Sequence, residues 1–254
     1  MPTVEQARSW LRRWDAQQEH YIADREERFE VIGDVVAGVA PDRPLIVDLG
    51  AGPGSLSVRL LDRFPGGRVV AVDADTLLLG LARAAHADRD GLTFVERDLR
   101  RPGWVEHLRE VAGGQADAVV STTALHWLGA QELADVYLGC AQILRPGGVL
   151  VNGDHLGEPA DRPRLAELVV RVREARARRA GVLDREDWES WWRSIGEAPE
   201  FSALTTEREP RPLDHSVPDK ADEADHRRLL LEAGFAEAGT VWQFGDDRVL
   251  VGVR

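Results

Sequence analysis

Short runs of apolar residues recur along the chain between longer stretches in which apolar residues return every three or four positions. The short runs lie at 45–49, 68–73, 92–96, 116–121 and 144–152, with glycine, proline or charged residues close to their ends. Such runs predict strands buried inside a parallel sheet, and the stretches between them predict helices. The alternation therefore predicts an α/β domain.

A glycine-rich turn follows the first run. Gly50, Gly52 and Gly54 stand at alternate positions between that run and a predicted helix that ends near residues 64–66. Glycine lets the backbone approach a ligand closely, because no Cβ stands in the way. A strand, a glycine turn and a helix in this order are typical of a cradle for a nucleotide-type cofactor.

The charge beside this turn indicates which cofactor fits. The dinucleotide fingerprint is G-x-G-x-x-G/A, but here the third glycine comes one residue early and Ser55 fills the last position. Asp48 lies just ahead of Gly50, and its carboxylate disfavours a pyrophosphate, since like charges repel. It suits a cofactor with positive charge, such as S-adenosylmethionine (SAM), which carries a sulfonium and an ammonium.

An acidic residue also ends the second run. Asp73 stands where a doubly wound sheet positions an acid to hold both ribose hydroxyls of a nucleotide. The alternative is that Asp73 only caps the next helix, but Asp75 is the better candidate for the cap. We therefore expect Asp73 to bind ribose.

The third run leads into Asp98 and Leu99. A carboxylate at Asp98 can accept a hydrogen bond from the adenine N6 amine, while the backbone N–H of Leu99 donates to a ring nitrogen. The alternative is a solvated turn, because aspartate favours turns in any case.

Histidines are the candidate general bases. His126 follows the fourth run, and His155 follows the fifth, so both are expected near the crevice where open α/β sheets bind ligands. A base is needed only if the acceptor of a transferred group must lose a proton. His215 is a third candidate, and each of the three can instead be structural. His155 ranks first because it ends a strand beside a long insert.

The segments that flank these runs predict helices. Residues 3–39 predict helices with Trp10, Leu11 and Trp14 on one apolar face. Between the helices, residues 19–25 form either a surface joint or a segment that closes over a cofactor. In the second interpretation Tyr21 and Arg25 cover the ligand, and Arg25 pairs with its carboxylate.

A long insert separates the fifth run from the end of the chain. Residues 164–179 predict a helix whose arginine-rich face is either solvated or a collar for an acidic substrate. Trp188, Trp191, Trp192 and Ile195 recur at helical spacing, which predicts an apolar stripe in the core or along a substrate pocket.

The end of the insert differs in composition from the C-terminal segment. Residues 196–220 predict an irregular loop because they are rich in proline and charge. A helix is expected over 222–233, followed by two strands over 235–244 and 248–253 that form an antiparallel hairpin.

Taken in order, the segments VDLGAGPGS, AVDAD, ERDL, DAVVSTTALHWL and LRPGGVLV resemble the motifs of class I SAM-dependent methyltransferases. The combination most resembles small-molecule enzymes of the trans-aconitate methyltransferase type and covers residues 45–152. The sequence STTALHW replaces the Asn/Asp-Pro-Pro-aromatic box of enzymes that methylate amino groups of bases or glutamine, which disfavours that substrate class.

This resemblance implies a Rossmann-like fold with a seven-stranded, mostly parallel sheet and an antiparallel C-terminal hairpin. We expect an N-terminal helical cap (1–40), a SAM-binding core (41–155), a helical lid over the substrate (156–220) and a C-terminal helix and hairpin that complete the core (221–254). The expected cofactor-binding residues are Tyr21, Arg25, Asp48, Gly50, Ala51, Gly52, Gly54, Asp73, Ala74, Asp98, Leu99, Thr123 and His126.

The implied activity is methyl transfer from SAM to a small molecule of secondary metabolism, with S-adenosylhomocysteine (SAH) as the product. The methylated atom, whether O, N or C, stays open. Alternatives are other SAM chemistry, such as carboxymethyl-SAM formation, and a SAM-binding module without catalysis. A NAD-dependent dehydrogenase is opposed by Asp48 and by the hairpin.

Composition narrows the partners. The net charge of −12 over 254 residues disfavours nucleic acid as a substrate. No apolar run approaches the roughly 20 residues that span a bilayer, and no signal peptide or metal site is apparent. The single cysteine, Cys140, excludes an intrachain disulfide and is expected to be buried. We expect a cytoplasmic monomer or homodimer that binds neither nucleic acid nor membrane.

Overall fold

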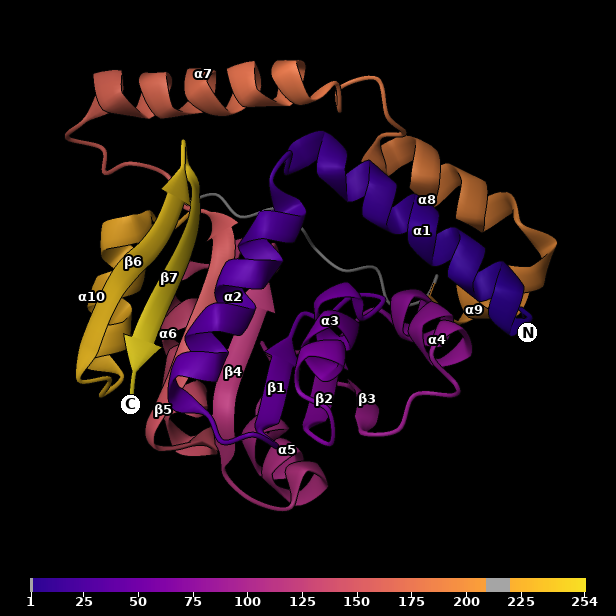
Figure 1. Ribbon diagram of the computed structural model, residues 1–254, viewed down its shortest axis with the longest axis horizontal. Coiled ribbons are helices and arrows are strands. Elements are labelled where there is room, and N and C mark those ends of the chain that lie inside the picture. Colours follow the sequence, from indigo (N-terminus) through magenta and orange to yellow (C-terminus); the bar gives the residue numbers. More distant parts are fainter. Residues whose placement is uncertain (1, 209–219) are drawn as a thin grey trace.

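The computed structural model describes residues 2–208 and 220–254, which form a central sheet with helices on both of its faces (Figure 1). The seven strands follow the order β3-β2-β1-β4-β5-β7-β6. Strands β1 to β5 are parallel, whereas β7 runs antiparallel to both β5 and β6. The strands are β1 Leu45–Leu49, β2 Arg68–Asp73, β3 Leu92–Glu96, β4 Ala116–Thr122, β5 Leu144–His155, β6 Glu237–Phe244 and β7 Asp247–Val253. The predicted class I methyltransferase fold is confirmed.

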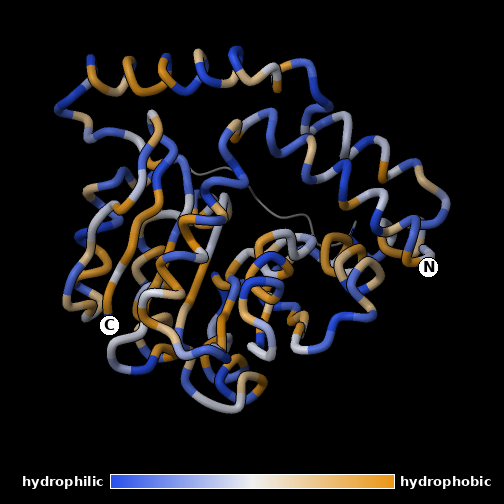
Figure 2. Tube along the Cα trace, in the orientation of Figure 1, coloured by the Kyte–Doolittle hydropathy of each residue, from blue (hydrophilic) through white to orange (hydrophobic). Residues whose placement is uncertain are grey.

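Two layers of helices bury the sheet. Helices α2 and α3 pack on one face, and α5, α6 and α10 pack on the other. Figure 2 shows hydrophobic residues gathered in the central strands, which explains why the sequence reads there as continuous apolar runs. Cys140 is fully buried on α6, as expected. The bounds are α2 Arg25–Val39, α3 Ser55–Arg63, α5 Trp104–Ala112, α6 Ala130–Ile143 and α10 Glu223–Glu232.

A third apolar cluster lies beside the sheet, where the N-terminal helix meets part of the insert. Helix α1 (Val4–Tyr21) packs with α8 (Trp188–Glu197) and with α4 (Thr76–Ala85), and Figure 1 shows α1 and α8 side by side. The ring centroids of Trp14 and Trp191 are 4.9 Å apart and nearly perpendicular, which is a favourable aromatic geometry. Trp191 and Ile195 are fully buried, so part of the tryptophan stripe belongs to the core.

The prediction of an irregular loop over 196–220 is wrong for residues 196–197, which end α8, and for residues 199–208. A short 3-10 helix, η2 (Pro199–Phe201), leads directly into α9 (Ser202–Arg208). Phe201 and Leu204 are buried in the third cluster, and a Cβ added to Gly80 of α4 would lie 2.5 Å from the Leu204 side chain. Close packing on α4 therefore stabilises a helix that the composition of the segment does not predict. His215 lies outside the described residues.

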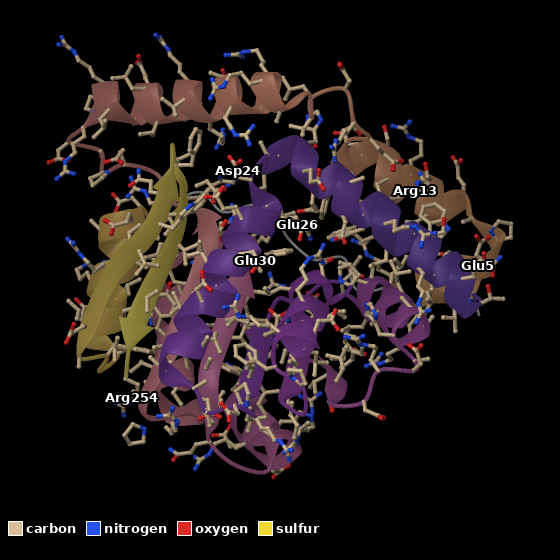
Figure 3. The ribbon with its side chains drawn as sticks, viewed as in Figure 1. Glu5, Arg13, Asp24, Glu26, Glu30 and Arg254 are labelled. Carbon is tan, nitrogen blue, oxygen red and sulfur yellow. The ribbon has the colours of Figure 1, made fainter. Side chains whose placement is uncertain are left out.

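Helix α7 (Pro163–Ala180) stands at the edge of the molecule, and only Ala177 is buried along it (Figure 1). Two of its arginines pair with the body of the protein. Arg176 contacts Asp24 at 2.6 Å, at the junction of α1 and α2 where Figure 3 labels Asp24. Arg173 donates to Asp246 at 2.5 Å. No helix within residues 2–208 and 220–254 combines the length and the apolar character that crossing a membrane requires.

A buried arginine connects α2 to the ends of three strands. Arg28 is fully buried and forms an ion pair with Asp247 at the start of β7. Its Nη1 also donates to Oγ1 of Thr122 and to the carbonyl of Gly153, both at 3.2 Å. Burial raises the pKa of Asp247, and Arg28 opposes that rise by stabilising the carboxylate. The guanidinium thus fixes the carboxyl ends of β4 and β5 relative to β7.

Removing this guanidinium should destabilise the fold strongly. In Arg28→Met, Asp247 is left as a buried carboxylate without its partner, and we expect the free energy of unfolding to fall by about 3–5 kcal/mol. Arg28→Met combined with Asp247→Leu should recover most of that loss, because the buried charge is gone. Urea unfolding followed by circular dichroism measures both.

The matched control is Arg63→Met on α3. Arg63 pairs with Glu30 and Asp34, whose side chains are 77% and 68% exposed. Exposed ion pairs contribute little, so this variant should lose less than about 1 kcal/mol. Equal losses in Arg28→Met and Arg63→Met would contradict the structural role assigned to Arg28.

Candidate active site

A cavity of about 540 Å³ opens at the carboxyl ends of the parallel strands. The loops after β1, β2, β3 and β4 form its floor, and residues of α1 and α8 form its outer wall. Ligands bind at this edge of open α/β sheets, where the strand order reverses between β1 and β4. The cavity is therefore the candidate active site.

The glycine turn forms one side of the cavity. Gly50, Ala51 and Gly52 line it, and both Gly50 and Gly52 have positive φ angles, +69° and +54°. The N–H groups of Gly50 and Ala51 donate to the carbonyl of Val72, which holds the turn against β2. A Cβ on Gly50 would lie 2.2 Å from Cβ of Ala124, so only glycine fits between the two loops.

Asp73 lines the cavity beside this turn, and Ala74 follows it on the same wall. One carboxylate oxygen of Asp73 accepts from the N–H of Gly52 at 2.7 Å, and the other accepts from the N–H of Asp75 at 2.8 Å. Burial raises the pKa of Asp73 to about 6. Asp75 caps α4 with its own side chain, as predicted, so capping does not account for Asp73.

Asp98 and Leu99, on the loop after β3, also line the cavity. The Asp98 carboxylate accepts from the backbone N–H and from Nε of Arg100, at 3.0 and 2.9 Å. Burial alone would raise the pKa of Asp98, but the hydrogen bonds from Arg100 outweigh it and lower the pKa. Asp98 is therefore ionised at neutral pH, where a carboxylate acts only as an acceptor.

Two of the expected cofactor-binding residues, Asp48 and Gly54, are not among the residues that line the cavity, so the geometry does not support their predicted contact with a cofactor. Asp48 is fully buried behind the glycine turn and accepts from Oγ of Ser57 at 2.6 Å. Burial raises its pKa to about 7. Gly54 faces Phe94, whose ring would lie 3.1 Å from an added Cβ. Both residues support the turn from behind, and neither position offers a direct contact to a ligand in the cavity.

The joint between α1 and α2 is also a wall of the cavity. Tyr21 and Arg25 both line it, so the two interpretations of this segment are not exclusive. Arg25 is buried and donates from Nη1 to Asp15 at 2.8 Å. Asp15 also accepts from Oγ of Ser55 at 2.6 Å, which connects the arginine to the first residue of α3. The hydroxyl of Tyr21 accepts from the N–H of Trp188 in α8 at 3.2 Å.

His126 lines the cavity and is held by a buried carboxylate that the sequence analysis did not identify. Nδ1 of His126 lies 2.8 Å from Oδ1 of Asp154. Although burial acts to raise the pKa of Asp154, His126 and Arg28 lower it to about 2. An ionised carboxylate only accepts, so Nδ1 carries a proton, and in the neutral form of the ring Nε2 is the acceptor.

The turn that carries His126 is strained. Thr123 lines the cavity with a φ of +50°, which is rare for a residue with a branched Cβ. Its N–H donates to the carbonyl of Gly153 at 3.0 Å. Strain of this kind persists only where neighbouring contacts enforce it, and it is typical of functional sites.

His155 also lines the cavity, but its surroundings differ. Its Nδ1 lies 3.7 Å from Oδ1 of Asp246 and 3.4 Å from Nη1 of Arg173. The ring thus lines the cavity and also lies beside the ion pair between Arg173 of α7 and Asp246 of the C-terminal hairpin.

Aromatic rings supply much of the outer wall, which sequence reasoning foresaw only in part. Trp188 and Trp192 of α8 line the cavity, whereas Trp191 on the same helix points into the core. Trp14 of α1 and Trp127 of η1 (Leu125–Trp127) complete the set. The stripe at 188–195 is therefore both core and pocket, because adjacent positions on one helix face different neighbours.

Comparison with known proteins agrees with this architecture. Residues 46–148 match a family of methyltransferase domains. The chain is 31% identical over 180 residues to trans-aconitate 2-methyltransferase from Streptomyces coelicolor, which covers 68% of this chain and 55% of that protein. It is 42% identical over 91 residues to malonyl-[acyl-carrier protein] O-methyltransferase from Geobacter sulfurreducens, covering 36% and 31%. The chain spans about half or less of the length of these curated relatives.

Solved structures share the fold. An O-methyltransferase family protein from Burkholderia thailandensis superposes with a TM-score of 0.56 at 21% identity, over 89% of this chain and 55% of that one. Magnesium protoporphyrin IX methyltransferase from Synechocystis with bound SAH superposes with a TM-score of 0.54 at 19% identity, over 93% and 86%. Residues 46–148 thus form a methyltransferase domain, and the relatives and the seven-stranded fold support a class I SAM-dependent methyltransferase.

Proposed function

We propose that this protein transfers a methyl group from SAM to a small-molecule acceptor and releases SAH. SAM is the methyl donor of the family, and the cavity offers groups that suit it. The observation that carries the proposal is the carboxylate of Asp73, which lines the cavity and is oriented by the N–H of Gly52. A carboxylate held there by two N–H groups keeps acceptor capacity for two ribose hydroxyls.

Other lining residues suit the rest of SAM. Asp98 and the N–H of Leu99 suit the adenine edge, and Gly50 to Gly52 let the backbone approach the methionine part closely. Arg25 uses one N–H for Asp15, and a guanidinium has five. Arg25 therefore remains a candidate partner for the carboxylate of SAM.

Methyl transfer from a sulfonium is an in-line displacement, so the protein mainly has to position donor and acceptor. An acceptor that must lose a proton needs a base as well, and we propose His126 for that role. Asp154 fixes its Nδ1–H at 2.8 Å and leaves Nε2 as the acceptor. This reverses the ranking from the sequence, because Nδ1 of His155 lies between the guanidinium of Arg173 and the carboxylate of Asp246.

The finer assignments stay proposals. Residues of α1 and α8 form the outer wall, which supports the division into a cap (1–40), a core (41–155), a lid (156–220) and a completing C-terminal part (221–254). A cytoplasmic location, a monomer or homodimer, and a role in secondary metabolism remain predictions. No contact among the described residues favours carboxymethyl-SAM chemistry or a non-catalytic module over methyl transfer.

The affinity for SAH should depend on pH through Asp73. Its pKa of about 6 means that the carboxylate is ionised above this pH and can accept from the ribose hydroxyls. Below it, the added proton removes acceptor capacity, so SAH affinity should fall by up to about tenfold per pH unit. Calorimetric titration with SAH between about pH 5 and 8 measures this, since SAH itself changes little over that range.

Two variants separate Asp73 from its neighbour. Asp73→Asn should bind SAH more weakly and lose the pH dependence. Asp48→Asn is the matched control, because Asp48 also titrates near neutrality but lies behind the turn. If the pH dependence disappears in Asp48→Asn and persists in Asp73→Asn, the ribose-binding role belongs elsewhere.

Replacing His126 should impair turnover but not cofactor binding. For an acceptor that loses a proton, His126→Ala should lower kcat by about a hundredfold to ten-thousandfold. Asp154→Asn should act similarly, because the amide can donate to Nδ1 and so shift the ring proton to Nε2. Transfer of tritiated methyl from SAM to small molecules of a cell extract measures turnover, and SAH titration checks the cofactor site.

His107→Gln on α5 is the control, since His107 does not line the cavity. It should retain full turnover. Loss of turnover in His155→Ala together with wild-type turnover in His126→Ala would restore the ranking expected from the sequence and contradict this proposal.

A further inference from the structure

We infer that the methyl acceptor is an uncharged, planar aromatic compound with an ionisable hydroxyl group, and not a polycarboxylate such as trans-aconitate. This inference rests on the proposed methyl transfer and concerns the part of the cavity beside α1 and α8. Four features of the cavity carry it: the aromatic wall, the pairing of the arginines, the carboxylates and His126.

The aromatic wall comes from separate elements. Trp14 of α1 lies with its ring centroid 5.4 Å from that of Trp188, and Trp188 lies 5.5 Å from Trp192. All three rings line the cavity, and Trp127 joins them from η1. Flat aromatic faces bind planar aromatic ligands by stacking and edge contacts, and they give a flexible carboxylate little to bind.

The three arginines that line the cavity in residues 2–208 and 220–254 already have acceptors. Arg25 donates to Asp15, Arg97 donates to the carbonyl of Glu96 at 2.8 Å, and Arg100 donates to Asp98. Arg25 is also the proposed partner of the SAM carboxylate, so a tricarboxylate would compete with Asp15 and SAM for Arg25, and with Asp98 for Arg100. Lys220, whose Nζ lies 5.5 Å from the Trp127 ring, is not among the residues that line the cavity.

Carboxylates further disfavour an anionic acceptor. Glu189 lines the cavity next to Trp188, whereas Asp75 and Asp98, which also line it, are paired with Arg208 and Arg100. The arginines of α7 do not line it, and Arg173 and Arg176 pair with Asp246 and Asp24. Of the two interpretations of this helix, an acidic-substrate collar is therefore the weaker. Like charges at a partly desolvated site repel strongly, so a polyanion is excluded more than a neutral molecule of equal size.

The histidine indicates what the acceptor must carry. The rings of His126 and Trp127 lie 4.5 Å apart, so an aromatic ligand against Trp127 comes close to the base. A carboxylate has no proton to lose at neutral pH and would leave His126 without a role. A hydroxyl on an aromatic ring transfers its proton to Nε2. The oxygen then bonds to the methyl carbon as the C–S bond breaks. The electron pair of the C–S bond stays on the sulfur, which becomes the neutral thioether of SAH.

Matched ligands test this inference on the full chain saturated with SAH. Calorimetric titration with naphthol should show binding, and hydroxynaphthoate, which adds one carboxylate to the same rings, should bind at least about tenfold more weakly, a difference of 1.4 kcal/mol. Trans-aconitate should not bind detectably at millimolar concentration. The ammonium analogue naphthylmethylamine should not bind more tightly than naphthol.

Variants locate the subsite. Trp188→Leu should weaken naphthol binding by about tenfold or more while leaving SAH affinity unchanged, and Trp188→Phe should retain most of the affinity. Trp242→Leu is the control, because Trp242 lies on β6, donates to Glu27 and does not line the cavity. Naphthol affinity should be unchanged in that variant.

The outcomes distinguish a failure of the proposed function from a failure of the assigned acceptor class. If the wild-type chain does not bind SAH, the proposed function fails, and this inference fails with it. If SAH binds but naphthol does not, or if hydroxynaphthoate, trans-aconitate or the ammonium analogue binds more tightly, the cofactor site stands and the assigned acceptor class is wrong. Transfer of tritiated methyl to naphthol by the wild type, and its loss in His126→Ala, would support both.

Discussion

The buried ion pair between Arg28 and Asp247 is the contact on which the geometry of the site depends. One guanidinium lies where the ends of β4, β5 and β7 meet the start of α2, and both candidate histidines follow those strand ends. A Cβ on Gly153 would lie 2.7 Å from Cδ of Arg28, so the backbone is glycine where the arginine passes. His126 lowers the pKa of Asp154 most, and Arg28 lowers it further. The same cation therefore helps to keep ionised the carboxylate that orients His126.

The carboxylates in the site are held in fixed orientations by hydrogen bonds from the protein. Asp73, Asp98 and Asp154 each accept from donors of the protein that fix the direction of their remaining lone pairs. A carboxylate oriented in this way recognises hydroxyl and amine hydrogens as well as positive charge. Such carboxylates suit a cofactor that combines a positive charge with an adenosine group. The carboxylate nearest the glycines, Asp48, lies behind the turn and accepts from Ser57.

Sequence reasoning succeeded where a prediction depends on one strand–turn–helix unit, as for the strands and the sheet class. Local patterns also identified Asp73, Asp98 and the glycine turn, which line the cavity and whose contacts with a cofactor stay proposals. Sequence reasoning failed where contacts join distant segments. Asp154 orients His126 across two strands, Phe201 and Leu204 order residues 199–208 by packing on α4, and Trp14 and Trp127 reach the same cavity as α8. Hydrophobic periodicity marks a helical face as apolar, but it does not say whether that face meets the core or a cavity, as Trp191 and Trp192 illustrate.

The two walls of the cavity have separate origins in the chain. The floor belongs to the sheet and its loops, whereas the aromatic wall belongs to α1 and α8, which pack on each other and on α4. Most side chains of the outer wall can therefore vary without changing the loops that form the floor. Under the proposed function, such a division lets a lineage change its methyl acceptor through a few substitutions in two helices, while the loops proposed to hold the donor are inherited unchanged.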